Sequence, residues 1–342
     1  MRIVAPDWLA ERTLELLRGS GSACNVIHLR GVAQKPEGDV ILADVAREDA
    51  SVIIADLREL DVPEHGSIAL EYVDIEISDA ADRAERHAHG LPSDAIVWED
   101  VQHRTSENTE LSLSFLAFMV LAMLLAAIAI LNDEPILIIG AMIVGPEFGP
   151  LAGLSVAIVQ LQRELVRRSL AALAVGFPAG ILLTCAGVLI LRGTGLDPDE
   201  FVSGENALSK FISHPDLYSF LVAYIAGTVG VLSLTSAKSG ALIGVLVSVA
   251  TIPAAANIGV AAAYGDWGEA GGAAAQLGIN LTTIVVAGVV TLFVQRRWYM
   301  TRRRAHLIDP AREAAGLPLG RSKSGTVAIG SQLEKLQKKG PE

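Results

Sequence analysis

A series of long apolar runs in the second half of the chain limits most strongly what this sequence can fold into. A helix needs roughly 20 apolar residues to cross the hydrocarbon core of a bilayer, and the first run, Leu111–Leu131, has 21 residues without a charge. The apolar runs cover residues 111–131, 135–161, 170–191, 217–234, 240–264 and 272–294. The chain is therefore predicted to be an integral membrane protein with an all-α bundle of six transmembrane helices.

The charges divide the chain into three regions. Residues 1–110 hold 10 Lys/Arg and 23 Asp/Glu, a net charge of −13. Residues 111–294 hold 6 Lys/Arg and 11 Asp/Glu, whereas residues 295–342 hold 11 Lys/Arg and 4 Asp/Glu, a net charge of +7. The acidic head argues against nucleic-acid binding, which favours a basic face. No long apolar segment follows Met1, so we expect no signal peptide and a head that stays in the cytoplasm.

The charges of the loops predict the orientation in the membrane. Basic residues follow the second and sixth runs, at 163–168 and 296–304, while acidic residues follow the first, third and fifth runs, at 133–134, 197–205 and 266–269. Positive charge marks the cytoplasmic side. Six spans place every basic segment inside and every acidic loop outside. Both termini are then cytoplasmic, in a plasma membrane of the bacterial inner-membrane type.

The head shows the pattern of a small α+β domain. Alternating or apolar segments predict strands at 2–6, 24–29, 39–46 and 67–77, and helical spacing predicts helices at 8–18 and 48–60. The order β-α-β-β-α-β is that of the split βαβ or ferredoxin-like pattern, which many regulatory domains share without sharing a function.

We therefore expect four regions. They are a ferredoxin-like cytoplasmic domain at 1–78, a polar linker helix and membrane junction at 79–110, six transmembrane helices at 111–294, and a basic cytoplasmic tail at 295–342. The tail is predicted to be largely disordered after about residue 320.

The second run is interrupted by Gly and Pro at 145–150, and the fifth run is interrupted at Thr251-Ile252-Pro253. Each triplet of runs thus holds a plain, a broken and a plain helix, and Gly140-Ala141-Met142-Ile143 resembles Gly240-Ala241-Leu242-Ile243. Inverted repeats with paired broken helices point to a transporter binding site, so we predict a 3+3 inverted repeat. The alternative is a six-helix bundle with two incidental proline kinks, because Pro and Gly are common in membrane helices.

The first interruption consists of Gly145, Pro146, Glu147, Phe148, Gly149 and Pro150. Two prolines remove two backbone donors and glycine allows non-helical angles, so the helix is predicted to break near mid-membrane. Glu147 lies in the break, and a carboxylate at that depth usually marks an ion or substrate path. Burial also favours the protonated carboxyl, as in a switch. The alternative is that Glu147 only caps the second half-helix.

Further candidates lie on later runs. Thr251, Pro253 and Asn257 mark the second predicted break, and Asn280 lies inside the sixth run. Amides inside a membrane can coordinate an ion or hydrogen-bond between helices, and both readings stay open. Thr235, Ser236 and Lys238 link the fourth and fifth runs, where they form either an anion contact or a plain polar loop.

The sequence contains no enzyme signature. It lacks His-Glu-x-x-His, a Walker-type phosphate loop and Gly-x-Ser-x-Gly. Cys24 and Cys185 have no Cys-x-x-Cys partner, and His87, His89 and His103 match no common ligand spacing. We therefore expect no metal, no cofactor and no enzymatic activity.

Three stretches resemble a known family. They are Ile-Gly-Ala-Met-Ile-Val-Gly-Pro-Glu-Phe-Gly-Pro at 139–150, Ser-Gly-Ala-Leu-Ile-Gly-Val at 239–245, and Asn280. With the head and its junction at Trp98, they resemble the uncharacterised hydrophobic membrane-protein family catalogued as a domain of unknown function (number 389), over about residues 1–300. Many members have a double proline in the fifth span, whereas Ala254 follows Pro253 here, which implies a milder break. The resemblance implies a membrane protein suspected of transport, with no agreed substrate.

These features favour a secondary transporter or channel-like permease. Its site would lie between the two predicted breaks, be proton- or cation-coupled through Glu147, and be regulated by the head. The alternative is a membrane-anchored sensor or scaffold whose head binds a small ligand. The expected partners are the lipid bilayer, further copies of the chain in a homo-oligomer, and an unidentified small solute or ion, with no nucleic acid.

Overall fold

The structure is a computed structural model that describes residues 1–73, 76–88, 95–196, 203, 212–213, 216–236 and 243–318, of which 243–250, 302 and 305 are described by their backbone alone. The chain forms two compact units. One consists of Met1–Trp98 together with Gln295–Glu342 and is called the head unit below. The other, Glu99–Val294, is called the membrane unit.

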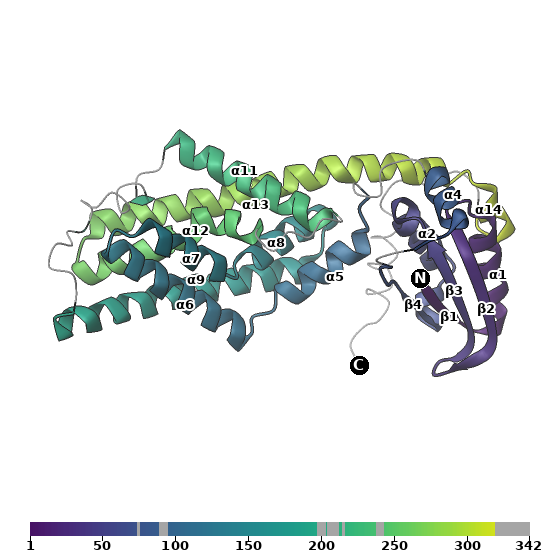
Figure 1. Cartoon of the computed structure of the whole chain (residues 1–342), viewed down its shortest axis with the longest axis horizontal. Coiled ribbons are helices and arrows are strands. Elements are labelled where there is room, and N and C mark those ends of the chain that lie inside the picture. The colour runs from purple at the N-terminus through teal and green to yellow at the C-terminus, as the bar shows by residue number, and fades with distance from the viewer. Residues whose placement is uncertain are drawn as a thin grey trace. The chain divides into compact units, whose positions relative to one another are not determined.

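The head unit is built on a four-stranded antiparallel sheet (Figure 1). Its strands lie in the order β2-β3-β1-β4, so β1 is paired on both edges. Ile3 and Ala5 of β1 are fully buried and alternate with more exposed neighbours, which places them on the core face of the sheet. The strands are β1 (Arg2–Ala5), β2 (Ala23–Gln34), β3 (Glu37–Val45) and β4 (Ser67–Ala69).

Two amphipathic helices complete the predicted β-α-β-β-α-β order. Leu14 and Leu17 from the first helix and Ile53 and Leu57 from the second are fully buried in the core that includes β1. The helices of this part of the chain are α1 (Asp7–Gly19), α2 (Arg47–Glu59), α3 (Val62–His65) and α4 (Asp79–Ala88).

The last predicted strand of the head, 67–77, is much too long. Only Ser67–Ala69 pairs, and residues 70–73 have no strand structure. The reason is the register, because Ala69 pairs with Arg2, where β1 begins. Residues 70–73 therefore have no strand edge beside them, although the apolar alternation of the sequence continues. Residues 74–75 lie outside the described part of the chain.

The C-terminal segment is part of the head's hydrophobic core. Helix α14 (Pro310–Ala314) packs against α1, as Figure 1 shows. Ala315 and Leu317 are buried in the same core as α1 and α2, and the Arg12 Nε–H donates to the main-chain oxygen of Ala315 at 3.0 Å. The basic tail predicted at 295–342 thus contains folded structure up to residue 318. The disorder predicted after about 320 concerns residues outside the described ranges.

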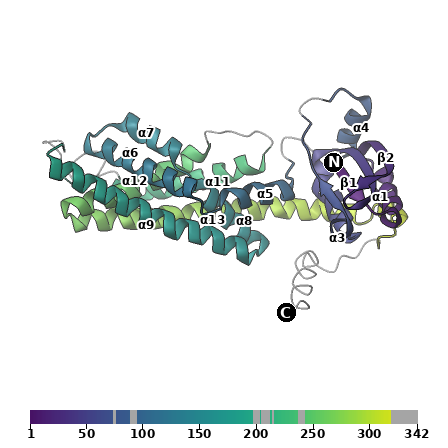
Figure 2. The same ribbon diagram turned by 90° about the horizontal axis from the view of Figure 1, so that it is seen from below.

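The described part of the membrane unit consists of helices and their connections, without a strand. Figures 1 and 2 show that α6, α7, α9 and α12 run side by side, in agreement with their packing. The helices are α5 (Trp98–Asn108), α6 (Leu113–Leu131), α7 (Pro135–Val144), α8 (Phe148–Gln160), α9 (Arg163–Thr194), α11 (Leu217–Thr235), α12 (Ile243–Tyr264) and α13 (Trp267–His306).

Four of these helices, α6, α9, α11 and α13, are long and apolar enough to cross a membrane. The pair α7 and α8 passes the same test as one span bent by 53°. Among the described residues the count is therefore four spans, or five with the bent pair, which supports membrane association. The 22-residue helix α12 has an apolar sequence, but the side chains of its first eight residues are outside the description.

The predicted break in the second run is present and short. Helix α7 ends at Val144 and α8 begins at Phe148. Gly149 and Pro150 were predicted to be part of the break, but both lie in the first turn of α8. Proline is tolerated there because the first N–H groups of a helix have no partner within the helix.

The predicted second break does not occur. Helix α12 runs without interruption from Ile243 to Tyr264, with Pro253 inside it. A single proline removes one backbone hydrogen bond, and Ala254–Ala256 are strong helix formers that are 2% exposed or less. Packing around this segment therefore keeps it helical. One of the two runs is broken and the other is intact, and the inverted repeat stays a hypothesis.

Small residues allow the helices of this unit to approach closely. A Cβ on Gly180 of α9 would lie 2.3 Å from the sulfur of Met123 on α6. A Cβ on Gly227 of α11 would lie 2.6 Å from the main-chain oxygen of Ile284 on α13. Association of membrane helices depends on such packing contacts, so these glycines fix the frame around the polar residues described next.

Candidate functional site

Glu147 lies in the break between α7 and α8, with an exposed fraction of 0%. The ten residues of α7 extend about 15 Å, roughly half of a 30 Å hydrocarbon core. Glu147 occupies the N-cap position of α8, and its main-chain oxygen accepts from Leu151 N–H at 3.2 Å, but its side chain makes no capping hydrogen bond. Instead, its Oε1 accepts from the Thr251 hydroxyl on α12 at 2.7 Å. The carboxyl group is therefore directed at a neighbouring helix.

Gly145 makes room for this arrangement. A Cβ at this position would lie 2.5 Å from Oε2 of Glu147 and 2.8 Å from Cγ1 of Ile252. Both distances are too short for real contacts, so any larger residue would push the carboxyl group or α12 aside. The glycine of the motif is thus explained by the space that the Glu147 side chain needs.

The other residues of the motif have packing roles. Phe148 packs against Leu151, Ala223 and Ile284 of α8, α11 and α13. A Cβ on Gly149 would lie 2.4 Å from the main-chain oxygen of Asn108, at the end of α5. Pro146 lies in the connection between the half-helices, and Pro150 is buried in α8.

Asn257 on α12 contacts an acid that the sequence analysis assigned to an outer loop. Its Nδ2 donates to Glu269 Oε1 at 2.9 Å, and the two residues are 1% and 8% exposed. The assignment of Glu269 to a loop is wrong, because α13 already begins at Trp267. The structure thus places Thr251 against the buried carboxyl group of Glu147 and Asn257 against that of Glu269.

Asn280 lies on α13 and accepts from Nε2 of Gln276 at 3.2 Å. Both are buried, with exposed fractions of 2% and 5%. Thr283, one turn further, is 6% exposed. The residues Glu269, Gln276, Asn280 and Thr283 are spaced by seven, four and three positions, so they lie on one face of the helix. We call these four residues the polar stripe of α13.

Of the predicted anion contact between the fourth and fifth runs, the structure describes Thr235 and Ser236. The Thr235 hydroxyl donates to the main-chain oxygen of Val231 at 3.1 Å, and Ser236 Oγ donates to that of Ser233 at 3.4 Å. Both hydroxyls therefore bond to carbonyls of the turn before them. Lys238 lies outside the described residues.

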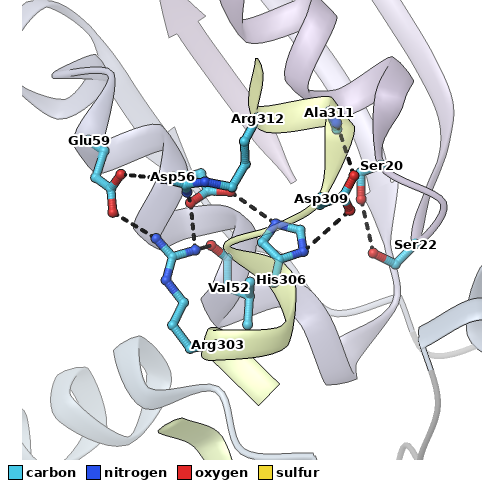
Figure 3. A network of polar contacts seen from close by, with 10 residues as sticks. All are labelled: Ser20, Ser22, Val52, Asp56, Glu59, Arg303, His306, Asp309, Ala311 and Arg312. Carbon is cyan, nitrogen blue, oxygen red and sulfur yellow. Dashed lines mark hydrogen bonds and ion pairs between the residues drawn. The ribbon is translucent and has the colours of Figure 1, made fainter. Parts of the chain in front are cut away.

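The head unit contains a buried cluster of ion pairs (Figure 3). Asp56 of α2 is fully buried and pairs with Arg303 at 2.5 Å, with His306 at 3.0 Å and with Arg312. Glu59, one turn further along α2, pairs with both arginines at 2.8 and 2.7 Å. The five residues Asp56, Glu59, Arg303, His306 and Arg312 are called the ion-pair cluster below. It ties the end of α13 and α14 to the head.

Burial governs the titration of the basic members of this cluster. The pKa of His306 is lowered by desolvation, although Asp309 at 3.5 Å acts in the opposite direction. Burial likewise lowers the pKa of Arg312, which is 1% exposed. His306 is therefore favoured in its neutral form, in which one ring nitrogen can still donate to the Asp56 carboxylate.

A second polar group of the head lines a cavity of about 440 Å³. His28 Nε2 lies 2.5 Å from Oδ2 of Asp39, and the Gly31 N–H donates to the other carboxylate oxygen at 2.8 Å. Burial raises the pKa of Asp39, but the hydrogen bonds from Gly31 and His28 outweigh it and hold the pKa below its usual value. The cavity is lined by Asp7, Ala10, Glu11, His28, Arg30, Gly31 and Asp39.

Neither unit contains a recognisable metal centre in its described residues, since no three His, Cys, Asp or Glu side chains there are arranged to hold an ion.

Two sets of polar residues were not predicted as site residues from the sequence. Glu269 and Gln276 had a usable signal, the helical spacing of polar positions within an apolar run. The ion-pair cluster had none, because its partners are 244 to 256 residues apart.

Part of the membrane unit is similar to a known family. Residues 142–286 match the family described as "Domain of unknown function (DUF389)", which confirms the predicted resemblance over this region. The chain is also 24% identical over 218 residues to the uncharacterized protein MJ0678 of Methanocaldococcus jannaschii. That match covers 62% of this chain and 65% of the relative, so the chain spans less than two thirds of that protein's length. No solved structure matches the chain significantly.

Proposed function

We propose that this chain, whose residues 142–286 form the DUF389 domain, is a secondary transporter or channel-like permease. Its site is the break between α7 and α8, and Glu147 binds the transported or coupling cation, including a proton. The membrane domain has six spans with cytoplasmic termini in the plasma membrane, the chain assembles as a homo-oligomer, and the head regulates flux.

One observation carries this proposal. Glu147 is completely buried in an interrupted helix and is bonded to the Thr251 hydroxyl at 2.7 Å. A structural cap needs its side chain at its own helix terminus, but this side chain points to another helix. Non-helical backbone at membrane depth is tolerated where it is buried or lines a polar cavity, and buried carboxyl groups in membranes usually serve ion or substrate paths. Carboxylate and hydroxyl oxygens also suit hard cations.

The second candidate is a membrane-anchored sensor whose head binds a small ligand. The observation in its favour is the cavity of about 440 Å³ beside the His28–Asp39 pair. In this version, the apolar helices serve as an anchor and Glu147 has no role in flux.

The experiment is a flux measurement on the full chain in liposomes, with a pH-sensitive and a cation-sensitive dye, between about pH 5 and 8. Glu147→Gln keeps the shape of the side chain and removes its charge. Exposed Glu134 at the start of α7 offers the matched control, Glu134→Gln. We expect flux in the wild type and in the control, and its loss in Glu147→Gln. Equal flux in all three variants would refute the role of Glu147, and an absence of cation flux in the folded wild type would favour the sensor.

A further inference from the structure

The start of α13 departs from an ordinary helix N-terminus. Asp266-Trp267-Gly268-Glu269 has the spacing of a capping box, in which the glutamate reaches back to the N–H of the first residue. Asp266 does cap the helix, since its Oδ1 accepts from Glu269 N–H at 3.0 Å. However, the Asp266 N–H already donates to the main-chain oxygen of Ala261 at 2.9 Å. The Glu269 carboxylate is therefore not needed to complete the cap.

The Glu269 side chain lies in the protein interior instead. It is 8% exposed and accepts from Asn257 Nδ2 at 2.9 Å. A negative charge at a helix N-terminus is favourable even when it is exposed to solvent, so the helix itself does not require burial. Burial of a carboxylate costs several kcal/mol, and such a cost indicates a role beyond capping.

A second, independent observation lies two turns further along the same face. The Gln276 amide donates from Nε2 to Asn280, while its Oε1 is buried and has no hydrogen-bond partner among the described residues. A buried acceptor without a donor costs about 1–3 kcal/mol. A cation beside this oxygen would recover that free energy. The acceptor lies about 10 Å along the helix from Glu269.

Helix α12 connects this region with the site at the break. Thr251 and Asn257, which hold Glu147 and Glu269, are six residues apart on α12, or about 9 Å along its axis. The polar stripe of α13 runs from Glu269 to Thr283, about 21 Å along the helix and a large part of the roughly 30 Å core. Buried oxygen atoms thus follow both α12 and α13 through the apolar unit.

We propose that the polar stripe of α13 is a second cation-binding region, in which Glu269 and Asn257 form one site for a monovalent cation and Gln276 Oε1 provides the next ligand. The inference rests on the proposed function and extends it from a single site at Glu147 to a path for a proton or an alkali ion. Asp266 is a charged group of the same helix terminus, and it accepts from the Glu269 N–H. At the end of α12, the Arg192 guanidinium of α9 lies 4.3 Å from the centre of the Tyr264 ring and donates to Ala263 O.

The test compares Glu269→Gln, Gln276→Leu and Glu147→Gln with Glu134→Gln as the control, in the full chain. The first measurement is binding without transport, as the rise in melting temperature of the detergent-solubilised protein when sodium replaces choline. Infrared difference spectra between about pH 5 and 8 then report the carbonyl stretch of protonated carboxyl groups. Gln276→Leu removes a buried acceptor together with its desolvation cost, so this variant is expected to stay folded even if Glu269→Gln does not.

We expect Gln276→Leu to reduce the sodium-dependent stabilisation at least tenfold in apparent affinity, if the ion is an alkali cation. If the ion is a proton, Glu269→Gln removes one carboxyl band and Glu147→Gln removes another. The proposal is wrong if Glu269→Gln and Gln276→Leu match the control in both measurements. If the variants at Glu269 and Gln276 change cation binding but the wild type shows no flux, the transporter proposal is wrong and the cation-binding region is supported. If only Glu147→Gln abolishes flux and the variants at Glu269 and Gln276 behave like the control, the transporter proposal is supported and the second region is wrong.

Discussion

The ion-pair cluster of the head permits a quantitative prediction for Asp56→Asn. Asp56 has no exposed surface and contacts three basic side chains, Arg303, His306 and Arg312. Removal of one partner from a buried ion pair costs about 3–5 kcal/mol, because the remaining charge stays buried. We expect about 3 kcal/mol here, at the lower end, since Glu59 still pairs with both arginines.

This loss corresponds to a clear fall in thermal stability. For a unit of this size, about 1 kcal/mol shifts the melting temperature by roughly 3–6 °C, so the head should melt about 10–15 °C lower. Hydrogen exchange measured by mass spectrometry on the full chain in detergent, in peptides from α2, reports the head alone. The control is Glu71→Gln, which alters the exposed Arg2–Glu71 pair, because such surface pairs contribute little. An equal loss of protection in both variants would refute the reasoning.

Three further predictions concern individual side chains. Gly145→Ala should abolish flux while the chain stays folded, because the added Cβ would lie 2.5 Å from Oε2 of Glu147 and displace its carboxyl group. Flux is measured in liposomes and folding by size-exclusion chromatography. Normal flux in this variant would contradict the prediction. The pKa of His306 is lowered by burial, so the unfolded head binds more protons and the head should lose stability as pH falls below about 6.5. His306→Asn should flatten that dependence in denaturant titrations at about pH 5 and 7. The pKa of Asp39 is also lowered, so its contribution to stability is present above its unfolded pKa and is lost as the pH falls through its folded pKa. Asp39→Asn should therefore reduce stability at neutral pH and weaken its dependence on pH in acid, as measured by denaturant titrations.

Local patterns predicted the elements of the head well. The alternation in β1 and β3 and the helical spacing in α1 and α2 are short-range signals that packing does not override, and these elements occur where they were expected. The strand at 67–77 failed because pairing is not local. Its residues alternate correctly, but the register with β1 ends at Ala69, and a strand without a partner is not stable.

The folded part of the basic tail could not be found from local composition for a similar reason. The sequence predicts only a basic tail at 295–342, whereas Arg303 and Arg312 within it are 8% and 1% exposed. Their charges are compensated by Asp56 and Glu59, 244 to 256 residues earlier in the chain. A count of local charge cannot distinguish an arginine that faces water from one that pairs across the fold.

The prolines of the second and fifth apolar runs show how far a motif determines the site. Pro146 follows Gly145, whose ψ of 126° is extended, and Pro150 lies one turn later, so two donors are lost within one turn. Pro253 stands alone before three alanines and the helix continues. The break therefore coincides with two prolines and a glycine, whereas a single proline leaves α12 continuous. Thr251 and Asn257 consequently lie on an intact helix, which keeps the positions of both hydrogen-bond donors relative to Glu147 and Glu269 rigid. A rigid α12 between two carboxyl groups is what a path with two fixed binding positions requires, whereas a second broken helix would have made the donors mobile.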